Sequence, residues 1–134
     1  MIVADTNVIV YLHINGPYSR QAEQALKKDP IWVAPRLWRS EFRNVLALQV
    51  RQRVLTLQFA LGFMEEAARL LQGFEHEVPS TLVLRLADSS GCSAYDCEFV
   101  VLAQDFGVPL VTMDSALLRR FPDVAISLDA FLAR

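Results

Sequence analysis

The sequence predicts an α/β fold, in which a central, mostly parallel sheet lies between two layers of helices as a three-layer α/β/α sandwich. Short apolar segments, such as 2–5 and 109–112, alternate along the chain with longer segments of helical periodicity. Parallel strands require crossover connections and are buried on both faces, so this alternation favours a parallel sheet covered by helices. With 134 residues and no visible linker or repeat, residues 1–134 are expected to form one domain.

Breaker residues define the elements of the first half of the chain. Gly16-Pro17 and Asp29-Pro30 each end a helical segment, Pro35 is expected to end the second strand, and Gly73 is a plausible C-cap. The last two helices of this half form a helical hairpin that should protrude from the sandwich. The expected elements are a strand at 2–5 (IVAD), helices at 7–14 and 19–28, a strand at 31–34 (IWVA), and helices at 36–53 and 56–72.

The second half continues the same alternation. Pro79 suits the start of a helix that ends near Gly91, and Ser93 begins another that ends at Gly107. The expected elements are a possible strand at 74–78 (FEHEV), helices at 80–91 and 93–107, a strand at 109–112 (PLVT), a short helix at 114–121, a strand at 124–127 (VAIS) and a terminal helix at 128–133.

Composition excludes several classes of protein. Hydrophobic residues make up 53% of the chain and charged residues 21%, which suits a globular protein with a core. No apolar run is long enough for a membrane span and the N-terminus resembles no signal peptide, so we expect no membrane association and a cytoplasmic location. Cys92 and Cys97 alone make neither a disulfide framework nor a zinc site, and we expect both to be reduced and structural.

Charge is unevenly distributed along the chain. The formal net charge is −2, yet the stretch 36–53 contains five arginines and one acid, and is therefore about +4. A local basic stretch favours binding of a polyanion. A solvated helix face explains the same charges without any ligand.

Four carboxylates are predicted to meet at one edge of the sheet. Asp5 follows the first strand, and Asp114 comes two residues after the strand that ends at Thr112. Glu41 and Asp96 lie early in helices that should begin at the same edge, the one at which ligands bind in parallel α/β folds. Each acid also has a local explanation, because Asp5 and Asp114 suit helix N-caps and Ser93-x-x-Asp96 resembles a capping box.

Helical geometry separates Glu41 and Asp96 from ordinary surface acids. Glu41 shares a stripe with Trp38 and Phe42 and should point inward. Asp96 has apolar neighbours at helical spacing, whereas Glu98 is expected to face away from the site on the wet face of that helix. Neither Glu41 nor Asp96 has a base at the spacings that allow a helical ion pair.

Several buried carboxylates without a base require a source of positive charge. Lysine is scarce, so a divalent cation is the simplest source. Oxygen ligands without a histidine or cysteine favour Mg²⁺ or Mn²⁺ over zinc. His13 and His76 are single histidines that we interpret as ordinary surface or half-buried residues.

These residues carry a resemblance to a known family. The N-terminal "VADTN", Glu41 early in the helix after the second strand, the block "CSAYDCEFVVLAQDFGVPLVTMD" and the overall length resemble a PIN domain, specifically the VapC-type toxins of toxin–antitoxin pairs. The resemblance covers essentially the whole chain. It implies a PIN-like sandwich whose catalytic, metal-binding set is Asp5, Glu41, Asp96 and Asp114. Thr6, Asn7 and Thr112 match polar positions that support such a site.

The activity implied by the resemblance is Mg²⁺- or Mn²⁺-dependent hydrolysis of RNA phosphodiester bonds, as an endoribonuclease. Arg39 and Arg43 are candidates for contacting RNA phosphates. The resemblance also implies a homodimer and a small antitoxin partner. The apolar hairpin over 46–71 is compatible with either surface, although core packing explains its apolar residues equally well.

Two rival functions remain on the sequence alone. A phosphoacceptor receiver domain also places acids and Mg²⁺ at strand ends, but it normally has adjacent acids after the first strand and a lysine at the end of a late strand, both absent here. The more serious alternative is a non-catalytic PIN-like module that binds RNA or protein. Such a module is expected to have lost an acid, and all four are present.

Overall fold

Five short strands form one sheet in the order β3-β2-β1-β4-β5, and every neighbouring pair is parallel. The computed structural model describes all of residues 1–134. The predicted α/β sandwich is confirmed, with a sheet that is entirely rather than mostly parallel. The strands are β1 (Ile2–Ala4), β2 (Trp32–Pro35), β3 (Glu75–His76), β4 (Leu110–Val111) and β5 (Ala125–Ile126).

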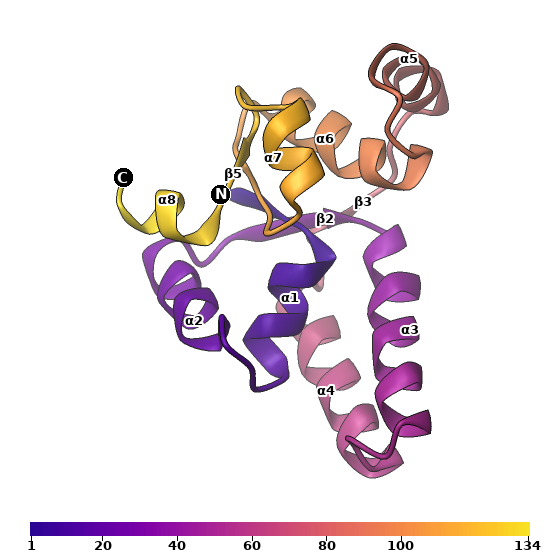
Figure 1. Cartoon of the computed structure of the whole chain (residues 1–134), viewed down its shortest axis with the longest axis vertical. Coiled ribbons are helices and arrows are strands. Elements are labelled where there is room, and N and C mark those ends of the chain that lie inside the picture. Colours follow the sequence, from indigo (N-terminus) through magenta and orange to yellow (C-terminus); the bar gives the residue numbers. More distant parts are fainter.

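Eight helices form the two outer layers. Figure 1 shows α5, α6 and α7 on one side of the sheet and α1 to α4 on the other, with α8 beside α2. Helix α6 packs directly on β1, β2 and β4. The helices are α1 (Thr6–His13), α2 (Ser19–Lys28), α3 (Leu37–Arg51), α4 (Leu57–Leu70), α5 (Ser80–Ser90), α6 (Ala94–Phe106), α7 (Ser115–Arg120) and α8 (Leu128–Leu132).

The core lies where the central strands meet the inner helix faces. All three residues of β1 are fully buried, as are Trp32, Trp38 and Phe42. The ring centroids of Trp38 and Phe42 are 5.7 Å apart at an angle of 63°, an edge-on arrangement that suits aromatic rings. This packing fixes the first turns of α3, on which Glu41 lies, against the sheet.

The α3–α4 hairpin extends away from the sheet, as predicted (Figure 1). The Thr56 hydroxyl begins α4 by accepting a hydrogen bond from the Phe59 N–H at 3.2 Å. Helix α4 ends with Leu71 as its C-cap rather than Gly73, which was predicted there. Gly73 lies two residues later with φ of 83°, a left-handed conformation that favours glycine.

Pro35 was expected to end the second strand, but it is the last residue of β2. It lies beyond the residues of β2 that pair with β1. On the other side, the hydrogen bonds to the β3 segment are donated by the N–H groups of Ala34 and Arg36. The missing N–H of proline therefore leaves no ladder partner unsatisfied, which explains why the strand tolerates it.

Other expectations concern single residues. Both cysteines are free, and Cys97 is buried. His13 and His76 are half-buried, with His76 packed edge-on against Phe106 at 4.8 Å between ring centroids. No helix combines the length and the apolar character that a membrane crossing requires.

Candidate acidic site

An aspartate follows the carboxyl end of β1 directly, and another lies three residues after the end of β4. Asp5 follows β1 and is the N-cap of α1, where its Oδ1 accepts a hydrogen bond from the Thr6 N–H at 2.7 Å. Asp114 caps α7, and its Oδ1 accepts from the N–H groups of Ala116 at 2.8 Å and Leu117 at 3.1 Å. The capping interpretation therefore holds for both residues. It leaves Asp5 Oδ2 and Asp114 Oδ2 outside the caps.

All four predicted acids line one pocket of about 380 Å³, within the roughly 300–1,000 Å³ typical of small-ligand sites. Asp5 and Asp114 come from strand ends, Glu41 from α3 and Asp96 from the first turn of α6. No lysine, arginine or histidine lines this pocket. Its lining residues are Asp5, Thr6, Asn7, Val10, Tyr11, Glu41, Asn44, Val45, Asp96 and Asp114.

Hydrogen bonds hold Asp5 in one orientation. The buried Thr112 hydroxyl donates to Asp5 Oδ2 at 2.7 Å, and the Asn7 amide donates to the same oxygen at 3.3 Å. The Thr112 oxygen in turn accepts from the Asp114 N–H at 3.0 Å. Thr112 therefore links the first and last acids of the pocket through one hydroxyl group.

Thr6 positions Glu41 in a similar way. Its hydroxyl donates to Glu41 Oε1 at 2.7 Å, a contact between residues on α1 and α3. Asp96 is placed by the start of α6, because the Ser93 hydroxyl accepts from the Asp96 N–H at 3.1 Å. The Ser93 half of the expected capping box is therefore present. Thr6, Asn7 and Thr112 all contact the acids that the sequence predicted them to support.

Burial and mutual repulsion raise the pKa values of three of the acids. Burial raises the pKa of Asp5 to about 6, against the opposing hydrogen bonds from Thr112 and Thr6, and the charges of Glu41 and Asp96 add to the increase. Burial also raises the pKa of Glu41, with a contribution from the charge of Asp96. Burial and the charge of Asp114 raise the pKa of Asp96. Added positive charge would relieve this repulsion.

Glu98, which was expected to face away from the site, lies outside the pocket that the four acids line. It is half-buried, and burial followed by the charge of Glu41 raises the pKa of its carboxyl. Glu98 therefore adds negative charge near Glu41 without forming part of the pocket wall.

The two candidate RNA-binding arginines lie outside the acidic pocket. Arg39 forms an ion pair with Glu75 of β3, to which it donates through Nε and, at 3.1 Å, through Nη2. Trp38 Nε1 donates to the same carboxylate at 2.6 Å. Sequence reasoning missed Glu75, because nothing local links it to a helix 36 residues away. Arg43 Nε donates to the Arg39 carbonyl at 3.2 Å, and its side chain lines the groove between α3 and α4.

Glu75 is held ionised by these partners. Burial acts to raise its pKa, but the hydrogen bonds from Arg39 and Trp38 outweigh burial and lower the pKa overall. The Arg39 side chain is 42% exposed, so water screens the pair and its net contribution to stability is small. Arg39 thus brings much less free positive charge to the surface than its position in the sequence suggested.

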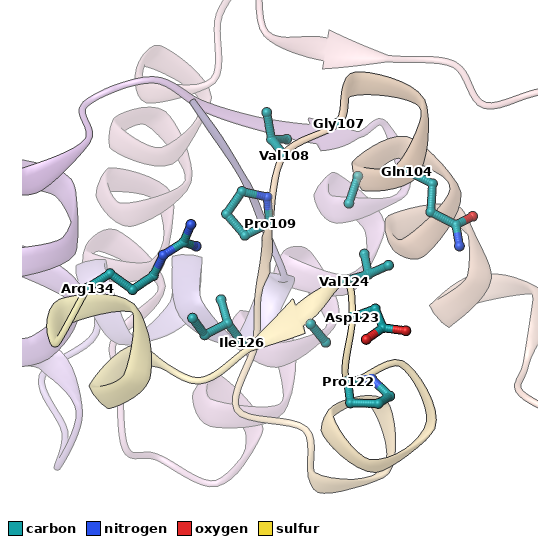
Figure 2. Close-up of a pocket in the computed structure, with 11 residues that line it drawn as sticks. Gln104, Gly107, Val108, Pro109, Pro122, Asp123, Val124, Ile126 and Arg134 are labelled. Carbon is teal, nitrogen blue, oxygen red and sulfur yellow. The ribbon is translucent and has the colours of Figure 1, made fainter.

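Figure 2 shows a different pocket, of about 530 Å³, near the amino end of β4. Pro109 lies in its wall, and Arg134 and Asp123 lie on opposite sides of it. Its other lining residues are mostly apolar, and its single acid faces no second carboxylate. The acidic pocket at the opposite strand ends is therefore the candidate for chemistry.

The donor set of the acidic pocket suits a hard divalent cation, because every charged group in it is a carboxylate. No group of three or more histidine, cysteine, aspartate or glutamate side chains lies close enough together to form a complete metal cage. Mg²⁺ is commonly held by one or two carboxylates together with water molecules. The residues thus fit a cation bound through part of the set, with the other acids acting through water.

The family model of the PIN domain matches residues 2–124 of this chain. The chain belongs to the PIN domain family. The match covers β1 to β4 and all four acids and ends just before β5, so the resemblance seen in the sequence is confirmed at the level of the family. A receiver domain is excluded by the same finding.

Three proteins with known names or structures are similar to this chain, and the two solved structures share its fold. Ribonuclease VapC3 of Pyrobaculum aerophilum is 28% identical over 124 residues, which cover 90% of this chain and 95% of that protein. The crystal structure of PAE2754 from the same organism has a TM-score of 0.79 at 21% identity and covers 99% of this chain and 87% of that one. The crystal structure of FitAcB from Neisseria gonorrhoeae has a TM-score of 0.69 at 20% identity and covers 95% of this chain and 96% of that one.

Replacing Thr112 is expected to weaken metal binding by the PIN domain. Thr112→Val removes the hydroxyl that orients Asp5 Oδ2 and accepts from the Asp114 N–H. Loss of such an orienting partner typically costs about 10- to 100-fold in metal affinity. Calorimetric titration with Mn²⁺ measures this effect. Asn7→Ala should weaken metal binding less, because the Asn7 contact to Asp5 is longer. Unchanged affinity in Thr112→Val would contradict the orienting role.

Proposed function

We propose that this PIN domain is a Mg²⁺- or Mn²⁺-dependent endoribonuclease that hydrolyses RNA phosphodiester bonds, as the toxin of a type II toxin–antitoxin pair. The observation that carries the proposal is the pocket at the strand ends, lined by four carboxylates and by no basic side chain. A similar protein, VapC3 of Pyrobaculum aerophilum, is named as a ribonuclease. Since the substrate would be cellular RNA, we expect the protein to act in the cytoplasm.

The four acids are assigned distinct roles. Asp5, which is 8% exposed and fixed by three hydrogen-bond donors, and Asp96 at the start of α6 are proposed as the main metal ligands. Asp114 and Glu41 complete the site, directly or through water. When bound, Mg²⁺ or Mn²⁺ supplies an activated water and stabilises charge on the phosphate oxygens.

The chain itself supplies orientation and proton handling. Thr112 and Asn7 hold Asp5 Oδ2, and Thr6 holds Glu41 Oε1, so neither carboxylate must be reoriented during the reaction. The raised pKa of Glu41, which is proposed to act directly or through water, suits a group that accepts a proton from an attacking water.

The test of this function is incubation of the purified protein with structured RNAs, with and without Mn²⁺, beside Asp5→Asn and Asp96→Asn variants. Cleavage by the wild type alone, and only with metal, supports the proposal. The alternative, a non-catalytic module that binds RNA or protein, is favoured if all three proteins bind RNA and leave it equally intact.

Phosphate contacts outside the pocket are proposed for Arg43, and more weakly for Arg39. Arg43→Gln should lower RNA affinity and reduce the slope of log affinity against log salt by about 0.7 for single strands. Arg39→Gln should change the slope less, because Glu75 neutralises its guanidinium. Fluorescence anisotropy over a salt series measures both. Equal slopes in wild type and Arg43→Gln would remove Arg43 from the interface.

An antitoxin helix is proposed to bind the groove of about 380 Å³ between α3 and α4. The groove is mostly apolar and is flanked by Arg43 and Arg51, so an amphipathic helix with acidic edges would complement it. Leu57 and Leu61, which are 62% and 52% exposed, would be covered. Leu61→Asp should abolish binding of a small antitoxin encoded in the neighbouring reading frame. We also propose a homodimer, which light scattering of the purified protein tests.

A further inference from the structure

One wall of the acidic pocket has no part in metal chemistry. Besides the acids and the residues that orient them, the pocket is lined by Val10 and Tyr11 of α1 and by Asn44 and Val45 of α3. None of these four side chains carries a charge, and only Tyr11 presents an aromatic ring. The wall therefore offers apolar and aromatic surface directly beside the carboxylates.

Tyr11 is held in place by a second aromatic residue. Its ring centroid lies 5.1 Å from that of Tyr18, with the ring planes at 57°. Tyr11 is half-buried, packs against the core and also lines the pocket. Burial, followed by the charges of Tyr18 and Asp5, raises the pKa of its phenol, which stays neutral and compatible with an adjacent anion.

RNA affinity beyond the scissile phosphate needs a source other than basic side chains of the pocket. A bound cation would attract that phosphate, but no basic side chain lines the pocket, and both candidate arginines lie elsewhere. A nucleobase has no charge and binds well to an aromatic face, and such stacking is the common way in which proteins hold single-stranded nucleic acid.

We propose that Tyr11, supported by Tyr18, stacks on an unpaired nucleobase next to the scissile phosphate and so makes the pocket a site for single-stranded RNA. The proposal rests on the proposed nuclease function and adds a substrate-binding residue to it. A base inside a duplex is already stacked on both faces and cannot reach Tyr11. The preference for unpaired RNA is thus set inside the pocket, beside the acids.

The experiment measures the binding of two dye-labelled RNA strands by fluorescence anisotropy in the presence of Mn²⁺. The measurement is made in the cold to slow cleavage, and gels confirm that the strands stay intact. One strand is a short oligoadenylate, and the other has the same length and backbone with abasic residues. Wild type should bind oligoadenylate about tenfold more tightly than the abasic strand, given the usual strength of base–aromatic stacking. Tyr11→Leu should reduce this ratio to less than about threefold by weakening oligoadenylate binding alone.

Three variants make the result specific. Tyr11→Phe should keep the wild-type ratio, because stacking requires the ring and not the hydroxyl. Tyr95→Leu is the matched control, since Tyr95 is 64% exposed on α6 and does not line the pocket. Tyr18→Leu should lower the ratio partly through loss of support for Tyr11. Thermal melts check that each variant is folded. Should Tyr11→Leu unfold, Tyr18→Leu provides the second test, and an unchanged ratio in that variant would contradict the inference.

The outcomes separate this inference from the nuclease function. The inference is overturned if Tyr11→Leu weakens the binding of both strands equally, or if wild type binds the two strands with the same affinity. It is also overturned if Tyr11→Phe lowers the affinity ratio as much as Tyr11→Leu does. Cleavage is scored separately on the same proteins. A wild type that prefers bases yet cuts no RNA supports Tyr11 and contradicts the nuclease. In an active enzyme, Tyr11→Leu should raise KM more than it lowers kcat.

Discussion

Asp5→Asn is expected to reduce RNA cleavage by at least about a hundredfold, the usual cost of removing a group that stabilises charge at a reacting centre. Asp5 is the most buried acid of the pocket, and its Oδ2 is the best oriented carboxylate oxygen. Asparagine keeps an acceptor for the Thr6 N–H but loses the negative charge that would hold a cation. Cleavage of labelled RNA in Mn²⁺ measures the effect.

The same substitution should not destabilise the metal-free protein. Burial raises the pKa of Asp5 from 3.8 to about 6, so keeping the carboxylate ionised at neutral pH costs the folded state about 3 kcal/mol. Removing this charge offsets the imperfect hydrogen bonding of asparagine. We expect a free energy of unfolding in urea at least equal to that of wild type.

Asp88→Asn is the matched control, because Asp88 is exposed on α5 and lies outside the pocket. It should leave both cleavage and stability unchanged. If Asp5→Asn lost activity together with several kcal/mol of stability, the loss would reflect misfolding, and the assignment of Asp5 as a ligand would lack support. Full activity in Asp5→Asn would contradict the assignment directly.

Mn²⁺ is expected to stabilise the wild-type protein strongly at neutral pH. At a hundredfold excess over Kd, a ligand that binds only the folded state adds about 2.7 kcal/mol, or several degrees in Tm for a domain of this size. Chelation should abolish both this shift and RNA cleavage. Thermal melts with Mn²⁺, with Mg²⁺ and with EDTA measure the effect.

The metal effect should decrease as the pH falls from 7 to 5. The folded-state pKa of Asp5, about 6, lies above its ordinary value of 3.8, so between these values the folded state binds the proton more tightly than the unfolded state. The contribution of Asp5 to the free energy of unfolding of the metal-free protein therefore rises on acidification, and it is lost as the pH rises through about 6. Protons also compete with the cation for Asp5, so the Mn²⁺-induced shift in Tm should shrink.

Asp96→Asn provides the comparison for these melts. It should reduce the Mn²⁺-induced shift at pH 7, because Asp96 is the second proposed main ligand. A shift of equal size in wild type and in Asp96→Asn, or one that grows on acidification, would mean that the cation binds elsewhere on the protein.

Most of the fold was predictable because local signals agreed with one another. The buried segment Ile2–Ala4, the Ser93 cap and the left-handed glycines at 91 and 107 each marked an element that the structure contains. Pro35 and Gly73 were misplaced because a strand edge and a helix end depend on neighbours that the local sequence does not reveal.

The acids of the pocket were predictable from topology. Parallel strands end at one edge of a sheet, and the helices that return to feed them begin at that edge, so Asp5, Glu41, Asp96 and Asp114 were brought together by chain order alone. The precise contacts that hold them were not. That the Thr112 hydroxyl bridges Asp5 and the Asp114 N–H depends on the register between β1 and β4.

Residue type and spacing were enough to predict the family, the alternation of strands and helices, and the set of carboxylates. Which charges meet was set by the fold as a whole. It paired Arg39 with Glu75 and placed Tyr11, packed against Tyr18, beside the acids. The physical reason is that helical period fixes only the direction of a side chain on its own helix, whereas its electrostatic and packing partners come from elements distant in sequence.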